Sequence, residues 1–207
     1  DLYRPYKQKR RTRGSIAREK GLEPLAEAIF AQDGRDPQAL ALDYIDPEKG
    51  VNTAEEALQG ANDIIAENLS DDADIRKALR QLVMRRGTFT CKAAEDAEED
   101  GVYRLYYDFC QPIPRLLDHQ ILAINRGEKE GILKPAVTLT GNEGAALVCR
   151  AALKPTAQVS AFVRTAAEDA YDRLIFPAIQ REVRNELSDR AYAGAIANFA
   201  LNLKPLL

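Results

Sequence analysis

Histidine, tryptophan and paired cysteines are scarce in this 207-residue chain, which has one histidine, no tryptophan and three cysteines. Cys91, Cys110 and Cys149 show neither a C-x-x-C spacing nor a histidine-linked pattern. An odd, unpatterned set argues against a disulfide framework or a zinc site and fits a reducing compartment. No stretch approaches the roughly 20 consecutive apolar residues that a membrane-spanning helix needs. We therefore expect a cytoplasmic protein that has no membrane partner.

The residue patterns that catalysis needs are also missing. His119 is the only histidine, and no local signature of a catalytic triad or a Cys–His pair surrounds it. The acidic run of Asp71, Asp72 and Asp74 lacks the spacing of a calcium-binding loop and is better explained as a helix start. Residues 126–131 place two glycines around a lysine, but not in the order of a phosphate-binding loop. The sequence therefore predicts no enzyme activity, no metal site and no cofactor.

Helical patterns cover most of the chain, in which 45% of the residues are apolar. Thr53 and Glu56 predict a capping box, and an apolar stripe follows as far as Leu69. Ser70 is the predicted cap of the next helix, and the short connection predicts that the two helices pack as an antiparallel pair. Glu143 is expected to complete a second capping box with Thr140.

Residues 88–92 and 132–139 favour extended structure and are expected to pair with each other. The tyrosines at 103, 106 and 107 are predicted to lie on a short helix between these strands. Apolar residues at helical spacing return in the last third of the chain, where Pro177 is expected to interrupt or kink the helix. The predicted fold is mainly α, a multi-helix array with at most a minor two-stranded β element.

Charge is distributed unevenly along the chain, whose net charge is −3. Residues 1–20 contain eight basic and two acidic residues, whereas the rest contains 21 basic and 30 acidic residues. The candidate nucleic-acid-binding residues in this basic arm are Arg4, Tyr6, Lys7, Lys9, Arg10, Arg11 and Arg13. Cations attract phosphates, and a tyrosine ring can stack on an unpaired base. The arginines could equally bridge carboxylates of the acidic body, and charge alone favours neither interpretation.

Six blocks of sequence, in order along the chain, resemble the Tex family of bacterial transcription accessory proteins. The first two are Tyr-Arg-Pro-Tyr-Lys-Gln-Lys-Arg-Arg-Thr at 3–12 and Ile-Ala-Arg-Glu-Lys-Gly-Leu-Glu-Pro-Leu-Ala at 16–26. The others are at 44–51, 57–67, 126–131 and 176–179. The blocks extend over nearly the whole chain, and the first two are long and specific.

The resemblance implies that the chain is a piece of a longer protein. In the family, a helical N-terminal region precedes a ribonuclease-H-like domain, helix-hairpin-helix modules and an RNA-binding domain with an OB fold. Residues 1–52 would be the basic arm and short helices of the N-terminal region, and 53–157 a central helical region with the small β element. Residues 158–207 would form long helices that lead to the ribonuclease-H-like domain.

Two functions are consistent with this resemblance. We favour a non-catalytic helical scaffold in a transcription accessory protein that binds nucleic acid and acts with RNA polymerase. The expected partners are the downstream domains of the same protein and RNA polymerase or an elongation complex. Weak contact with DNA or RNA is also expected. The alternative is an auxiliary nucleic-acid-binding segment that contacts phosphates through residues 4–13. The acidic body favours the scaffold, because it would repel phosphate over most of its surface.

Overall fold

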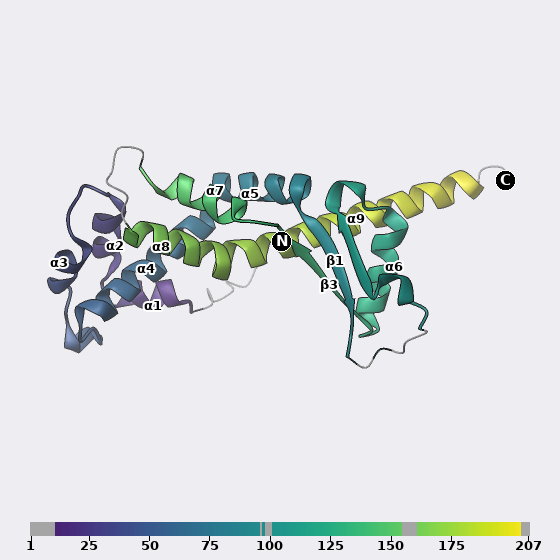
Figure 1. Cartoon of the computed structure of the whole chain (residues 1–207). Coiled ribbons are helices and arrows are strands. Elements are labelled where there is room, and N and C mark those ends of the chain that lie inside the picture. Colours follow the sequence, from purple (N-terminus) through teal and green to yellow (C-terminus); the bar gives the residue numbers. More distant parts are fainter. Residues whose placement is uncertain (1–10, 96, 98–100, 155–160, 204–207) are drawn as a thin grey trace, which may run out of the picture. The chain divides into compact units, whose positions relative to one another are not determined.

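The structure is a computed structural model that describes residues 11–95, 97, 101–154 and 161–203 (Figure 1). The chain forms two compact units, each of which joins stretches that are far apart in the sequence. Unit 1 comprises Asp1–Asp72 and Val148–Leu174, and unit 2 comprises Ala73–Leu147 and Ile175–Leu207. Helices dominate both units, which confirms the mainly α prediction. The three consecutive segments predicted from the sequence are a different division and stay a prediction.

Unit 1 is built around one long helix, α4. Its helices are α1 (Arg13–Glu19), α2 (Glu23–Phe30), α3 (Pro37–Leu42), α4 (Ala54–Asp71), the end of α7 (Glu143–Ala152) and α8 (Ala161–Asp169), with a 3-10 turn, η1, at Pro47–Lys49. A π-helical stretch, η4 (Ala170–Ile175), follows α8. Helices α1, α2, α3 and α8 all pack on α4. The predicted apolar stripe of α4 is therefore buried on several sides, from Leu58 to Leu69.

The starts and ends of the first helices follow local chemistry that the sequence predicts. The Thr12 hydroxyl accepts a hydrogen bond from the Ser15 amide at 3.0 Å and caps α1. Gly21 ends that helix with a positive φ of 79°, which glycine adopts without strain. Thr53 caps α4 by accepting from the Glu56 amide at 3.2 Å, as predicted. The Glu56 carboxylate accepts from the Asn52 amide instead of completing the box on Thr53.

Unit 2 combines helices with a small antiparallel sheet. Its helices are α5 (Ala73–Arg86), α6 (Asp118–Lys129), the start of α7, and α9 (Phe176–Leu203), and its strands are β1 (Thr88–Ala93), β2 (Asp108–Pro112) and β3 (Leu133–Thr138). Two 3-10 turns, η2 (Arg104–Tyr106) and η3 (Ile113–Arg115), flank β2. The strand order is β2-β1-β3. Helices α6 and α9 pack on β3, and α9 also packs on α5 and α6.

The third strand, β2, is a correction to the predicted two-stranded element. The predicted pair is present, with Phe89 opposite Val137 and Cys91 opposite Pro135. However, β2 pairs with the other side of β1, so that Thr90 lies opposite Cys110. The tyrosines, which are predicted to lie on a short helix, form the 3-10 turn η2 and its two flanking positions. The sequence shows no clear strand pattern here, because β2 is short and ends in a proline.

Two further expectations about helix caps are wrong. Ser70 is not the residue before α5, because α4 continues to Asp71, and the Ser70 hydroxyl donates to the Glu67 carbonyl within α4. Asp72 alone, with an extended ψ of 117°, separates α4 from α5. Helices α4 and α5 lie in different units, so their antiparallel pairing stays a prediction. Helix α7 begins at Glu143, so Thr140 lies too far upstream to cap it.

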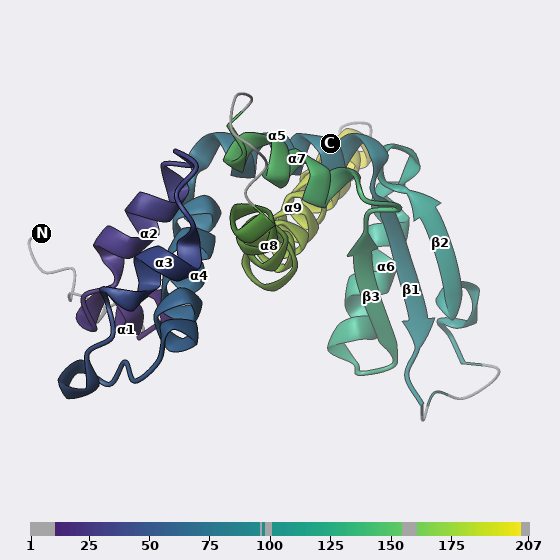
Figure 2. The ribbon, with the colours of Figure 1, turned by 60° about the vertical axis from the view of Figure 1, so that its left-hand side comes forward.

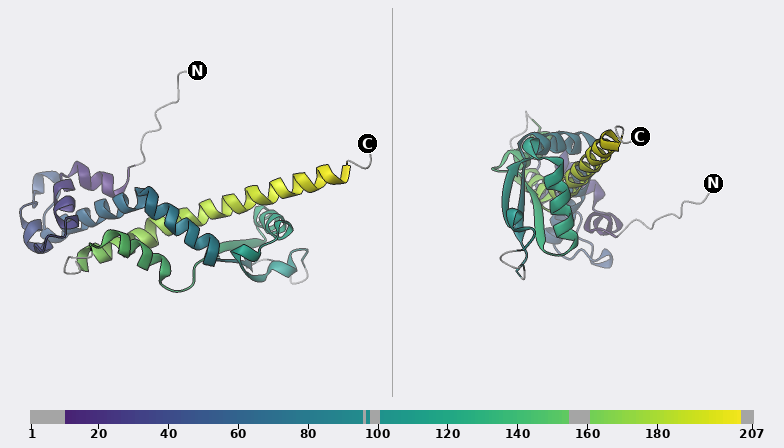
Figure 3. Two further views of the ribbon diagram at one scale, coloured as in Figure 1. Left: turned by 90° about the horizontal axis from the view of Figure 1, so that it is seen from above. Right: turned by 90° about the vertical axis from the view of Figure 1, so that its right-hand side faces the viewer.

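Helix α9 is a single long helix of 28 residues (Figure 3). The widened π-helical turn lies just before Pro177, which has no amide hydrogen to donate to the preceding turn. Ile179, Val183 and Leu187 are buried within unit 2, as the apolar spacing predicts. Farther along, Ile196 is 70% exposed, so the end of the stripe is not covered by the described residues of unit 2.

Gly60 on α4 tests the packing of unit 1. A Cβ at this position would lie 2.3 Å from Leu22 Cδ1 and 3.3 Å from Ala17 Cβ. Gly60→Ala should therefore lower the free energy of unfolding by about 1–3 kcal/mol, although alanine is normally the better helix former. Urea unfolding measures this effect, and Glu55→Ala on the exposed side of α4 should change stability by less than about 0.5 kcal/mol. An unchanged or raised stability in Gly60→Ala would contradict the packing.

Thiol reactivity tests burial in both units. Cys110 is exposed, whereas Cys91 and Cys149 are buried. Burial raises the pKa of the Cys91 thiol to about 11, and it also raises the pKa of Cys149. A thiol-specific reagent near pH 8 should therefore label Cys110 quickly in the native chain and label the other two only after unfolding. Rapid labelling of Cys91 in the native chain would show that the sheet does not cover it.

Candidate nucleic-acid interface

The basic arm is only partly described by the structure. Of its predicted residues, Arg11 and Arg13 are described, whereas Arg4, Tyr6, Lys7, Lys9 and Arg10 lie outside the described residues. The phosphate-binding prediction for those five therefore stays a prediction. The two described members lie at the start of α1, because Thr12 between them is the cap of that helix.

Both described arm residues interact with carboxylates of their own unit. The Arg11 guanidinium donates to Glu19 at 2.9 Å, in a pair whose side chains are 71% and 60% exposed. Arg13 is exposed, and its charge acts on two carboxylates of unit 1, Asp63 on α4 and Asp169 on α8. Arg11 and Arg13 thus partly neutralise the acidic body, while their exposure leaves them accessible to solvent.

Arg18 links α1 to α4 through a set of polar contacts. Its guanidinium donates to Glu67 at 2.6 Å, to Asn68 at 2.7 Å and to Glu23 at 3.3 Å. The Arg18 side chain is 30% exposed and that of Glu67 only 18%, so this pair is better shielded than the Arg11 pair. The position of Arg18 in the basic arm does not predict this role, because its partner Glu67 is 49 residues away in the sequence.

A second arginine holds two carboxylates at the centre of unit 1. Arg173 donates to Asp63 at 3.1 Å and to Asp169 at 2.8 Å, and Asn62 donates to Asp169 at 3.3 Å. Burial raises the pKa of Asp63, against the opposing charge of Arg173. The hydrogen bond from Arg173 lowers the pKa of Asp169, and the same bond raises the pKa of Arg173. The positive charge of Arg173 therefore compensates for the burial of the Asp63 carboxylate on α4.

A cavity of about 360 Å³ adjoins the described part of the arm. Its lining includes Arg13 and Lys20 as well as Glu56 and Asp63, so its charge is mixed. The Lys20 ammonium already donates to the Gly50 carbonyl at 2.9 Å. A phosphate would meet carboxylates as well as cations here, which makes the cavity a poor anion site.

The residues considered for catalysis and metal binding belong to different units. His119 is exposed on α6 in unit 2, and Asp71 is the last residue of α4 in unit 1. Among the residues that the structure describes, no three His, Cys, Asp or Glu side chains are placed to hold a metal ion together. Within the same residues, no helix combines the length and the apolar character that crossing a bilayer requires.

Comparison with protein families now identifies the chain's relatives. The family model described as Tex central region-like matches residues 32–199, which is most of the chain. The chain belongs to the Tex family. The resemblance seen in the six sequence blocks is thereby confirmed.

Individual relatives match over all or nearly all of the chain. It is 45% identical over 211 residues to YdcI of Bacillus subtilis and 31% identical over 224 residues to the transcriptional accessory protein Tex of Neisseria gonorrhoeae, with all of this chain covered in both cases. It is also 29% identical over 221 residues to the human S1 RNA-binding domain-containing protein 1, with 98% covered. The matches cover 29%, 28% and 22% of these relatives, so the chain spans less than a third of their length.

The Arg173 cluster predicts a pH-dependent loss of stability. Arg173→Met should lower the free energy of unfolding by about 1–3 kcal/mol near pH 7, because both aspartates then lose their compensating charge. The loss should shrink as the pH falls, since a protonated carboxyl no longer needs the guanidinium. Asp63, whose pKa lies above the ordinary 3.8, protonates first in the native chain, and Asp169, whose pKa lies below that value, protonates last.

Urea unfolding at several pH values measures this loss. The matched control is Arg35→Met, which removes an exposed arginine paired with Asp33 in the same loop. That change should lower the free energy of unfolding much less than Arg173→Met does, because water screens the exposed pair. A loss of stability in Arg173→Met that is the same at pH 3 and pH 7 would contradict the electrostatic role.

Proposed function

We propose that this chain is a non-catalytic helical scaffold within a transcription accessory protein that binds nucleic acid and acts with RNA polymerase. The observation that carries the proposal is the internal use of basic charge at the arm. Arg11 and Arg18 each bond to a carboxylate of unit 1, and Arg13 acts on two more. Arg18 in this way holds α1 to α4, and arginines that are engaged with carboxylates are less available to phosphate.

The family membership supports the transcriptional part of the proposal. One relative is named as a transcriptional accessory protein and another by an S1 RNA-binding domain. The matches cover less than a third of those proteins, so we assign the main nucleic-acid contact to regions outside this chain. The scaffold's partners are then the downstream domains of the same protein and RNA polymerase. We also propose a cytoplasmic location, because a reducing compartment would keep the exposed Cys110 free.

The second candidate function is auxiliary nucleic-acid binding through the arm. It is favoured by the density of basic residues at 4–13 and by the exposure of Arg11 and Arg13. In this alternative, phosphates compete with the carboxylates of unit 1 for the same guanidinium groups. If the chain is a scaffold, removing the arm's charges should lower its stability. If the arm binds nucleic acid, the same change should lower nucleic-acid affinity.

Changing Lys9, Arg10 and Arg11 together to Ala separates the two functions. The scaffold predicts negligible binding of duplex DNA by the chain at all salt concentrations, and a stability loss of up to about 1 kcal/mol in the variant. The alternative predicts weak binding at low salt, with a slope of log K against log[salt] no steeper than about −4 to −5. The triple change would then flatten that slope and leave the melting temperature almost unchanged.

The matched control variant removes three positive charges from unit 2 instead of from the arm. Lys77, Arg85 and Lys129 are exposed in unit 2, and their joint change to Ala should alter neither result. Salt-dependent binding that only the arm variant loses would contradict the scaffold and support the alternative. Fluorescence anisotropy and thermal unfolding supply the two measurements.

A further inference from the structure

Helix α9 has one apolar side that packs inside unit 2. Four side chains on this side are at most 1% exposed: Ile179, Val183, Leu187 and Ala191. Helix α6, which lies along one face of the sheet, packs beside α9, and a Cβ at Gly194 would lie 2.3 Å from Asp118 Oδ2 of α6 (Figure 2). Every residue from 195 to 202 is exposed. The described residues of unit 2 therefore leave the last turns of α9 uncovered.

The apolar stripe of α9 changes sides after Ala191. Tyr192, Ile196 and Phe199 are 55%, 70% and 67% exposed, and we call these three residues the distal stripe. At about 100° per residue, they lie within about 60° of one another around the helix axis. By the same rotation, the distal stripe is about 170° from the centre of the buried side. The distal stripe thus faces away from the part of unit 2 that packs on α9.

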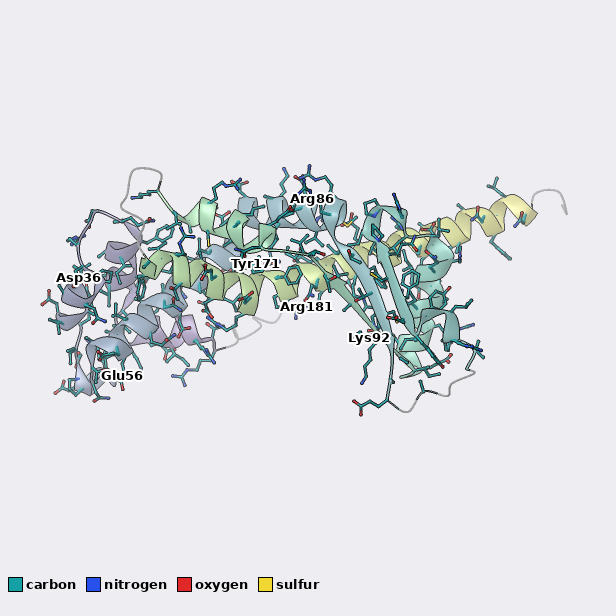
Figure 4. The ribbon with its side chains drawn as sticks, in the orientation of Figure 1. Asp36, Glu56, Arg86, Lys92, Tyr171 and Arg181 are labelled. Carbon is teal, nitrogen blue, oxygen red and sulfur yellow. The ribbon has the colours of Figure 1, made fainter. Side chains whose placement is uncertain are left out.

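On the side of the distal stripe, the first half of α9 is polar. Arg181, which is labelled in Figure 4, and Asn185 lie on this side by the same rotation, and both are exposed. By contrast, no residue from Ala191 to Leu203 is charged. The side of a helix that faces water normally carries charged or polar residues. A side that changes from polar to apolar along one helix indicates a surface that another body covers.

The spacing within the distal stripe fits a helix as the occupant. Its members are four and three residues apart, which is the spacing of the seam between two packed helices. Ala193, Ala195 and Ala200 lie beside the stripe, and such short side chains let a second helix approach closely. An uncharged contact of this kind resembles a protein core and is typical of a permanent interface.

The small size of this surface favours an occupant in the same polypeptide over a second copy. The helix from Tyr192 to Leu203 is about 18 Å long and presents a side about 10 Å wide, or roughly 200 Å², whereas a stable complex buries roughly 800 Å² per partner. A domain of the same polypeptide needs a smaller contact, because a short connection gives it an effective concentration of about millimolar. The relatives have such further regions, since the matches cover only 29% of YdcI of Bacillus subtilis and 28% of Tex of Neisseria gonorrhoeae.

We propose that the distal stripe is the surface on which a helix of a downstream domain of the same Tex-family protein docks. Tyr192, Ile196 and Phe199 would pack against apolar side chains of that helix, beside the flanking alanines. The end of α9 extends beyond α6, so unit 2 leaves this surface accessible (Figure 3). The proposal rests on the proposed scaffold function, because it names the surface through which this chain would hold a neighbouring domain.

The first test compares the 207-residue chain with the full-length Tex-family protein that contains it. Mass spectrometry measures backbone hydrogen exchange in residues 195–202 of both proteins. We expect exchange at least about tenfold slower in the full-length protein, because docking opposes the fraying of an uncovered helix end. Residues 179–187, whose apolar side packs in unit 2, serve as the internal reference and should change little. Equal exchange of 195–202 in the two proteins would overturn the proposal.

Two variants locate the docking surface. Phe199→Glu places a charge on the distal stripe, and the matched control, Asn198→Glu, places the same charge one residue away and off the stripe. In the full-length protein, Phe199→Glu should speed limited proteolysis between this chain and the downstream domain at least about tenfold, and Asn198→Glu less than about twofold. In the 207-residue chain, neither variant should change the unfolding temperature, since both side chains are exposed. Equal proteolysis of the two full-length variants would contradict the proposal.

Sedimentation velocity of the 207-residue chain tests the other occupant. A monomer supports docking within one polypeptide, whereas a dimer that Phe199→Glu dissociates would make a second copy the occupant and overturn the proposal. The scaffold function is tested separately by the joint change of Lys9, Arg10 and Arg11. Unprotected residues 195–202 in the full-length protein would therefore refute the docking surface alone, and nucleic-acid binding that only the arm variant loses would refute the scaffold.

Discussion

Pairing between arginines and carboxylates of different helices is the interaction on which both units depend. In unit 1, Arg18 connects α1 to α4, and Arg173 connects the π-helical stretch to α4. In unit 2, Arg76 and Arg80 on α5 pair with Glu182 and Glu186 on α9, four residues apart on each helix. This matching spacing repeats along one face of each helix, so the pairs fix the register in which the helices pack.

The same pattern continues between α9 and α6. Arg184 donates to Glu128 at 2.7 Å, and Arg190 donates to Asp118 at 3.3 Å and to the Leu116 carbonyl at 3.0 Å. Most of these pairs are partly exposed, and each is worth little on its own because water screens it. Together, the arginine–carboxylate pairs favour one packing arrangement of the helices. The apolar faces of the helices would be compatible with several arrangements. The scaffold function that we propose would need this kind of specificity.

Much of the fold could be predicted from local sequence, whereas the pairing could not. Thr53 caps α4 as expected, the stripe of α4 is buried, and the stripe of α9 is buried from Ile179 to Leu187 but exposed at Ile196. These features depend on residues within a few positions of one another. By contrast, Arg18 and Glu67 are 49 residues apart, and Arg173 and Asp63 are 110 apart. No local pattern distinguishes such an arginine from one that is exposed to bind phosphate. Strand β2 was missed for a related reason, since only its pairing with β1 stabilises so short a segment.

The coupling between Arg18 and Glu67 tests the structural use of basic charge most directly. A double-mutant cycle would compare Arg18→Met, Glu67→Gln and the double variant by urea unfolding near pH 7. We predict a coupling free energy of about 1 kcal/mol, with the double variant more stable than the sum of the single effects implies. Effects that add within about 0.3 kcal/mol would show that the pair stabilises nothing and would contradict the scaffold account.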